Sequence, residues 1–207
     1  MTTRPVTRLR ARTLAGGIAV LLATMLMAVL IGAAELGWQR VLAEIWAQLV
    51  GGTSPLSERE AAILWQLRVP RVLLAGAVGA ALAMSGAAFQ GVFRNPLADP
   101  FLLGAAAGAG MAATIVVVFA PALTLWAASA LPVAAFAGAV GGVALSWLLS
   151  TSYGGVSPTT LLLAGVAVSA FLTAVQTFVQ QLNADTIRQV YNWMLGGLAI
   201  TGWADFV

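Results

Sequence analysis

The sequence lacks three residue types on which much enzyme chemistry depends. It contains no cysteine and no histidine, and all 10 of its basic residues are arginine, so lysine is missing too. Without cysteine and histidine, the usual zinc sites, thiolate nucleophiles, haem ligands and Ser-His-Asp triads are excluded. Without lysine, the chain cannot form a complete phosphate-binding P-loop. Any work driven by ATP must therefore be done by another chain.

Charge is also scarce. Only 8% of the 207 residues are charged and 60% are hydrophobic, whereas an average soluble domain is about 25% charged. This composition predicts an all-α, polytopic helical bundle surrounded by membrane lipid. The net charge of +3 comes from few residues, so it gives no reason to expect a nucleic-acid partner.

Five apolar stretches are candidates for membrane spans, because a span takes about 20 residues. They are predicted at about 14–34, 69–90, 101–119, 131–150 and 158–181, and a sixth begins before Val207. The first run is longer than the roughly 7 to 15 apolar residues of a secretory signal, so we expect a retained helix. Four arginines precede it without any acid, which places the N-terminus in the cytoplasm; they are Arg4, Arg8, Arg10 and Arg12.

Between the spans, the sequence predicts short interfacial helices at about 38–50, 57–66 and 185–195. Ser57 followed by Glu60 matches a capping box at the start of the second of these. Small residues recur every fourth position in three of the spans, a pattern that lets membrane helices approach closely. The three sets are Ala75, Gly79 and Ala83; Gly104, Gly108 and Ala112; and Gly138, Gly142 and Ser146.

Arg68 and Arg71 flank Pro70 at the start of the second span. If the first helix runs outward, both arginines lie on the outer side of the membrane. They are either an ordinary snorkelling pair at a helix end or a docking site for carboxylates of an external partner, since guanidinium groups pair with carboxylates in a fixed orientation. Pro70 fits the first turn of the span, where a missing N–H costs nothing.

The crossing RNPLADP at 94–100 falls on the cytoplasmic side in this topology. Two prolines fix its backbone, which is more constraint than a plain turn requires and favours a gate or contact surface. Candidate gate residues are Arg94, Asn95, Pro96 and Leu97, with Ser152 and Ser157 from the second internal crossing. Ser157 and Pro158 are expected to cap and open the next helix.

The fifth span carries a series of polar side chains: Ser169, Thr173, Gln176, Thr177 and Gln180. Hydroxyl groups in membrane helices often bond to their own backbone, so packing alone is one interpretation. The other is the wall of a polar pathway, because a glutamine facing lipid is costly.

Seven sequence motifs, some of them described above, occur in the order found in one known family. They are RVPR at 68–71, GAALAMSG at 79–86, Gln90, RNPLADP at 94–100, LGAAAGA at 103–109, LLAG at 162–165 and WMLGG at 193–197. Together they resemble the permease subunits of the ABC importers for iron siderophores, haem and vitamin B12.

The resemblance implies a permease of about ten helices, in the cytoplasmic (inner) membrane of a prokaryote. A second permease copy, identical or different, would complete a central pathway. Separate ATPase subunits would hold ATP and Mg²⁺, so this chain would need no cofactor and would not be an enzyme. An extracytoplasmic substrate-binding protein would dock at Arg68 and Arg71, the Asn95–Leu97 and 151–157 crossings would lie near the cytoplasmic gate, and the fifth span would border the pathway.

Residues 1–207 would then be the N-terminal part of a single permease domain. The chain stops about two thirds of the way along such a permease, before the segment that couples to the ATPase, so on its own it is expected to be inactive in transport. Ferric siderophore is the expected substrate, with haem and cobalamin as alternatives. An integral membrane enzyme is disfavoured because no span holds paired carboxylates, and a scaffold is disfavoured by the specific RNPLADP crossing.

Overall fold

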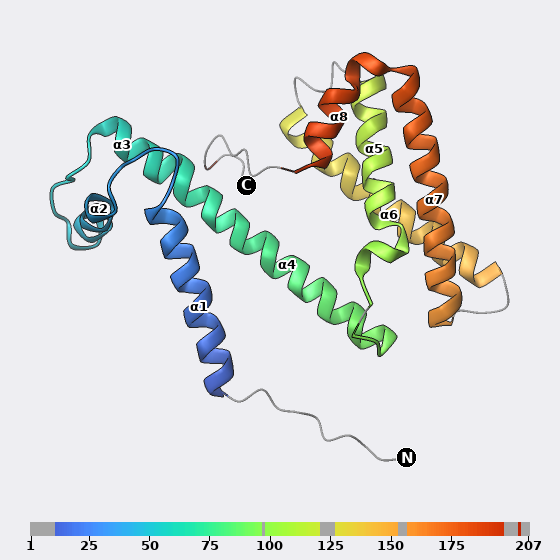
Figure 1. Ribbon diagram of the computed structural model, residues 1–207, viewed down its shortest axis with the longest axis horizontal. Coiled ribbons are helices and arrows are strands. Elements are labelled where there is room, and N and C mark those ends of the chain that lie inside the picture. The colour runs from blue at the N-terminus through green and yellow to red at the C-terminus, as the bar shows by residue number, and fades with distance from the viewer. Residues whose placement is uncertain (1–10, 97, 121–126, 153–156, 197–202, 204–207) are drawn as a thin grey trace. The chain divides into compact units, whose positions relative to one another are not determined.

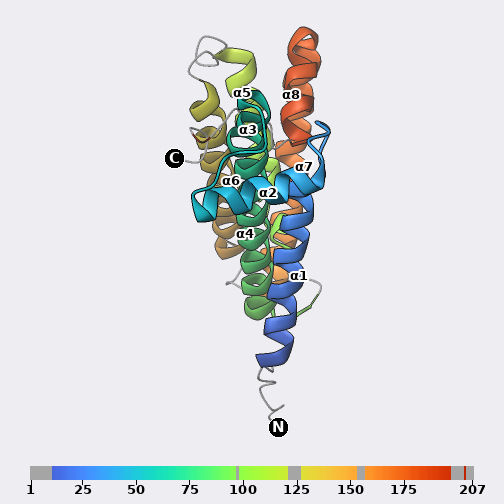
Figure 2. The same ribbon diagram turned by 90° about the vertical axis from the view of Figure 1, so that its left-hand side faces the viewer.

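The computed structural model describes residues 11–96, 98–120, 127–152, 157–196 and 203. Most of these residues are helical, and none of these ranges contains a strand, which confirms the all-α prediction. The chain forms two compact units, residues 1–80 with 198–207 and residues 81–197. Figures 1 and 2 show the helices from two directions.

The first unit contains α1 (Ala11–Leu30), α2 (Trp38–Val50), α3 (Glu58–Ala62) and the first half of α4 (Val69–Phe93). In both views α2 lies beside the carboxyl end of α1 (Figures 1 and 2). The four buried side chains of its core come from α2 and from the segments around it: Leu36, Val41, Leu56 and Leu64. Gly51 ends α2 in the left-handed conformation, with φ of 77°, which glycine adopts without steric cost.

The predicted break between the short helix at 57–66 and the following span is wrong. A six-residue π-helix, Ile63–Arg68, joins α3 to α4 without interruption, so Pro70 lies inside one long helix. Proline has no N–H to donate, and the Val69 N–H donates to Leu64 O in the π pattern. Trp65 O would accept from the Val69 N–H in an α-helix and from residue 70 in a π-helix. The first N–H is already used by Leu64 O and the second is missing in Pro70. The indole Nε1 of Trp203 donates to Trp65 O instead, at 2.9 Å.

The second unit is built on α5 (Ala105–Phe119), α6 (Ala127–Ser152) and α7 (Pro158–Leu182), which pack against one another. A 3₁₀ turn, Ala184–Thr186, leads into α8 (Ile187–Met194), which lies beside α5 (Figure 1). The small-residue prediction is confirmed where α5 crosses α6, because a Cβ on Gly108 would overlap the carbonyl of Gly138. The two backbones are therefore in direct contact.

The predicted span at 101–119 is not one helix. A 3₁₀ turn, Pro100–Leu103, is separated from α5 by Gly104, whose φ is 84°. A Cβ at Gly104 would lie 3.2 Å from Ser146 Oγ and 3.3 Å from Gly142 O, so close packing on α6 accompanies this break. The 15 residues of α5 rise roughly 22 Å, less than the roughly 30 Å of a hydrocarbon core.

In the described part of the chain, four helical segments are long and apolar enough to cross a membrane: Ala11–Leu30, Glu58–Phe93, Ala130–Ser152 and Pro158–Leu182. Both predicted caps form: Ser57 makes the capping box with Glu60, and Ser157 caps α7 with Pro158 in its first turn.

Candidate functional site

Arg68, one of the two predicted docking residues, already has partners within its own unit. Its Nη1 donates to Val29 O at 3.0 Å and its Nη2 donates to Ala34 O at 2.8 Å. Both acceptors are backbone carbonyls at or just beyond the carboxyl end of α1. The half-buried guanidinium therefore binds dipoles rather than a carboxylate.

Arg71 lies one turn further along the same helix and is exposed. It lines a cavity of about 400 Å³ together with Gly32 and Arg68. It also lines a second cavity, of about 280 Å³, between α1 and α4. Among the residues that the structure describes, Arg71 has no hydrogen-bond or ion-pair partner. Of the two arginines, Arg71 is the one available to an external anion.

Sequence reasoning missed Glu44, which is completely buried beside this region. It accepts hydrogen bonds from the Ser54 hydroxyl, from Trp65 Nε1 at 3.1 Å and from Gln48 Nε2 at 3.3 Å. The Ser54 hydrogen bond is the main cause that lowers the pKa of Glu44 below its ordinary value, because it stabilises the ionised form. The available signal was an acid three residues after Val41, on the buried face of α2.

Arg94, a predicted gate residue, ends α4 in the left-handed conformation with φ of 49°. The Asn95 N–H donates to Gln90 O at 3.2 Å and the Arg94 N–H donates to Gly91 O at 3.4 Å, which is the hydrogen-bond pattern of a Schellman motif. Glycine is usual at this position, so an arginine there holds some strain. Asn95 and Pro96 follow it on the surface, and Leu97 lies outside the described residues.

Replacing Arg94 by glycine is expected to raise the free energy of unfolding by about 1 kcal/mol, because glycine adopts positive φ without a Cβ penalty. Arg94→Ala is the matched control, since it removes the same guanidinium and keeps the strain. Thermal unfolding of the purified protein compares the two. An equal gain from alanine would show that the guanidinium, and not the backbone, is the source of the strain.

The end of the RNPLADP crossing is anchored to α6 and α7. Asp99 accepts the Phe101 N–H at 2.9 Å, Ser146 Oγ donates to Leu103 O at 2.9 Å, and a Cβ on Gly165 would overlap the carbonyl of Leu102. The 3₁₀ turn after the crossing is thus fixed against the two helices that the second internal crossing connects.

That second crossing runs from Ser152, the last residue of α6, to Ser157, the cap of α7. Ser152 Oγ donates to Leu148 O at 3.0 Å and is exposed. Ser150 and Thr160 hydroxyls lie 3.1 Å apart and join the ends of the two helices. Residues 153–156 lie outside the described part of the chain.

The polar residues of α7 divide into two sets. Gln176 and Gln180 are buried: Gln176 Nε2 contacts Met194 Sδ of α8 at 3.1 Å, and Gln180 Nε2 donates to Thr114 Oγ1 of α5 at 3.3 Å. Ser169 is half-buried, and Thr173 and Thr177 are exposed. The glutamines thus tie α7 to its neighbours, while the threonines face out of the unit.

Gln180→Leu is expected to lower the free energy of unfolding by about 1 kcal/mol, the usual range for a polar contact between membrane helices. Thr114 loses its side-chain partner but can bond its own helix backbone, which limits the loss. Thr177→Val should change little, since its hydroxyl already donates to Thr173 O at 2.9 Å on an exposed face. Chemical denaturation of both variants measures this, and an equal cost would contradict the assignment of Gln180 to packing.

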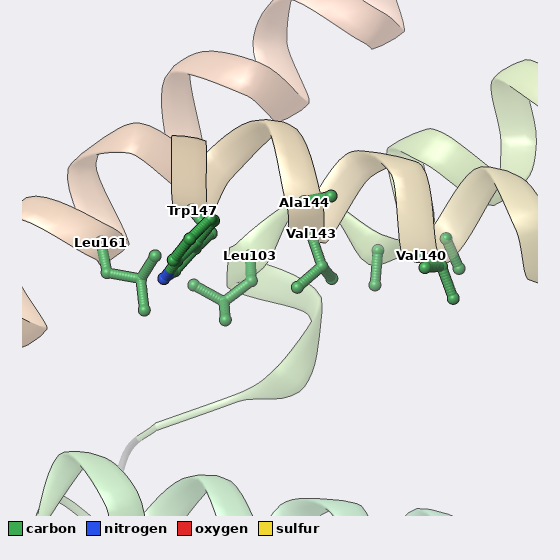
Figure 3. A pocket seen from close by; sticks show the side chains of 8 residues that line it. Leu103, Val140, Val143, Ala144, Trp147 and Leu161 are labelled. Atoms are coloured by element: carbon green, nitrogen blue, oxygen red, sulfur yellow. The ribbon is translucent and has the colours of Figure 1, made fainter. Parts of the chain in front are cut away.

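An apolar groove of about 490 Å³ runs along α6, lined by Leu103, Ala105, Ala139, Val140, Val143, Ala144, Trp147 and Leu161. In Figure 3 the Trp147 ring lies beside Leu161, with Leu103 between Trp147 and Val143. No charged side chain lines it. Sites that hold a small polar ligand combine an apolar wall with convergent polar groups, so this groove suits acyl chains or another helix better than a metal chelate.

The long apolar helices and the crossings between them define a helical membrane protein. Residues 20–207 match the model of the FecCD transport family. The chain belongs to this family, as its motifs predicted.

Two relatives illustrate the family. The chain is 39% identical over 183 residues to the permease protein of the achromobactin transport system of Dickeya dadantii, covering 87% of this chain and 51% of the relative. It is 39% identical over 153 residues to the permease protein of the vitamin B12 import system of Pectobacterium atrosepticum, covering 73% and 45%. The chain thus spans about half the length of the curated relatives it matches.

The fold is also similar to a solved structure assigned to the metal-chelate type of ABC transporters, in an inward-facing conformation. The TM-score is 0.71 with 24% identity, over 94% of this chain and 56% of that one.

Proposed function

We propose that this chain belongs to the permease subunit of an ABC importer, which carries a ferric siderophore across the cytoplasmic membrane by alternating access. The observation that supports this proposal most is the family match over residues 20–207. ATP is hydrolysed by separate ATPase subunits in this proposal, and residues 1–207 contain no lysine with which to form a P-loop of their own. In this proposal the N-terminus is cytoplasmic.

Each membrane side has a proposed role. On the outer side, the Arg68–Arg71 end of the long helix receives carboxylates of a substrate-binding protein. On the inner side, Arg94, Asn95, Pro96 and Leu97, with Ser152 and Ser157, form the gate and face the ATPase. The contacts of Ser146 with Leu103 and of Ser150 with Thr160 support a rigid connection between these two crossings.

The pathway is proposed to run along α7, between this subunit and a second permease copy. Thr173 and Thr177 are exposed on this helix and Ser169 is half-buried, so they present small, weakly polar groups to it. Gln176 and Gln180 would support the same wall from behind. Such a wall has few strong donors and would let a bulky chelate pass without holding it.

A ferric siderophore is the proposed cargo, with cobalamin and haem as alternatives. Relatives named for achromobactin transport and for iron(3+)-hydroxamate import support a siderophore. Relatives named for vitamin B12 import, at the same 39% identity as the achromobactin permease, support cobalamin as the alternative.

The test is ATP hydrolysis by the reconstituted complex of the full-length permease with the ATPase and binding protein encoded beside it. Binding protein loaded with a ferric siderophore, from a panel of several chemical types, should stimulate hydrolysis, and binding protein offered cobalamin or haemin should not. Stimulation by cobalamin or haemin alone would replace the substrate, and no stimulation by any of the three would contradict the proposed function.

A further inference from the structure

Helix α2 carries a stripe of large apolar side chains that the described part of its unit leaves exposed. They recur at spacings of four, four and three residues, which places them on one side of the helix. This α2 stripe consists of Trp38, Leu42, Trp46 and Leu49, with exposed fractions of 59%, 37%, 68% and 76%. Apolar side chains gathered on one exposed helix face mark an interaction surface.

Another side of α2 is fixed to the protein. Val41 and Glu44 are completely buried, and Glu44 accepts a hydrogen bond from Trp65 Nε1 at 3.1 Å. Arg40 forms an ion pair with Glu60 at 2.7 Å. Turning α2 to bury the stripe would break these contacts and leave a buried carboxylate without its donors, which is costly. The stripe is therefore open to a partner from outside the described part of this unit.

The position of α2 beside α1 places the stripe at a membrane surface. α1 is long and apolar enough to cross a membrane, and none of its residues is buried. α2 begins eight residues after Leu30, the last residue of α1. In Figure 1 α2 is seen end-on, level with the upper end of α1, and in Figure 2 its axis runs across α1. Amphipathic helices that lie along a membrane surface bury their apolar face roughly 5–10 Å deep.

The side chains of the stripe suit this level of a bilayer. Tryptophan favours the headgroup region, because its ring is apolar and its N–H finds hydrogen-bond partners there. Leucine suits the acyl chains just below, and the stripe contains no charged residue. A water-soluble partner on this face would have to displace lipid from beside the end of a membrane span. Lipid is therefore the occupant that the position of the stripe favours.

We propose that α2 is an in-plane membrane anchor, and that the head groups and upper acyl chains of one leaflet cover its stripe. Contact with lipid does not depend on the proposed function; only the assignment to the outer leaflet rests on the topology proposed with it. The hydrogen bond from Trp65, in the π-helix that leads into α4, connects this anchor to the long helix.

The first test is electron paramagnetic resonance of a nitroxide attached at Leu42→Cys or Leu49→Cys in the full-length permease, in lipid nanodiscs. Residues 1–207 contain no cysteine, and any cysteine beyond them is replaced by serine. Oxygen concentrates in lipid and a nickel chelate stays in water, so the collision rates of the label with each report its surroundings. At both positions, oxygen collisions should be frequent and nickel collisions rare. Ala43→Cys, exposed on the same helix outside the stripe, is the matched control and should show frequent nickel collisions.

Two results at positions 42 and 49 would overturn the proposal. Rare collisions with both oxygen and nickel would show that protein covers the stripe, either a second permease copy or a soluble partner. Frequent nickel collisions would show that the stripe lies in water. Both leucines are on the exposed side of α2, so the labels leave the buried core of the unit unchanged.

The second test uses the native tryptophans, in nanodiscs made with lipids brominated near the head group. Bromine quenches the fluorescence of a tryptophan that it contacts. Trp46→Phe should lower the fraction of the total fluorescence that is quenched, and the double variant with Trp38→Phe should lower it further. A quenched fraction that rose or stayed the same in both variants would contradict contact between the stripe and lipid, whatever the labels showed.

Discussion

Gly138→Val is expected to destroy the packing of the second unit, with a loss of about 3 kcal/mol or more in the free energy of unfolding. A Cβ at position 138 would overlap the carbonyl of Gly108 on α5. The obstacle is backbone, which cannot rotate away as a side chain can. Relief would require α5 and α6 to separate, and the contacts of both helices with α7 would be lost with them.

Gly141→Val is the matched control, three residues further along α6. No atom lies within 4 Å of a Cβ at that position, so valine there should be tolerated. Size-exclusion profiles and thermal unfolding in detergent compare the two variants. Equal damage at both positions would show that α6 rejects a larger side chain for a reason other than its crossing with α5.

Glu44→Ala is expected to lower the free energy of unfolding of the first unit by about 1 to 3 kcal/mol. The carboxylate is buried, and its removal leaves Trp65 Nε1, on a half-buried side chain, without its acceptor. Ser54 and Gln48 also lose this acceptor, but both residues are exposed, and the Ser54 hydroxyl keeps Leu56 O as an acceptor. Glu35→Ala is the control, because Glu35 is exposed.

The same residue gives the stability a pH dependence. The folded-state pKa of Glu44 is lowered, so its contribution is present above the unfolded value of about 4.3 and is lost as pH falls through the folded pKa. The difference in stability between the unaltered protein and Glu44→Gln should therefore shrink in acid. A difference that stayed constant from neutral pH through the folded pKa would show that the charge of Glu44 does not stabilise this unit.

Local patterns in the sequence predicted what depends on nearby residues. Ser57 with Glu60, and Ser157 with Pro158, cap helices within one turn, so spacing alone identifies them. The four-residue spacing of small residues predicted that helices approach closely in these spans, and the structure shows such an approach where α5 crosses α6.

What the sequence did not predict depends on distant partners. Arg68 binds carbonyls 34 and 39 residues away, and Trp65 reaches Glu44 across 21 residues. The continuous helix through Pro70 depends on a π turn, and the break at Gly104 accompanies close packing on α6. Neither follows from the propensity of the residues concerned.

The most direct test of the account is uptake of radioiron as ferric siderophores of several chemical types, beside labelled cobalamin. The cells should lack their own importer and carry the full-length gene with its neighbouring ATPase and binding-protein genes. The account predicts iron accumulation that requires ATP hydrolysis and no accumulation of cobalamin. Uptake of cobalamin alone would contradict the proposed substrate. If the cells took up no iron, no cobalamin and no haem, the assignment of this chain to an importer would be contradicted.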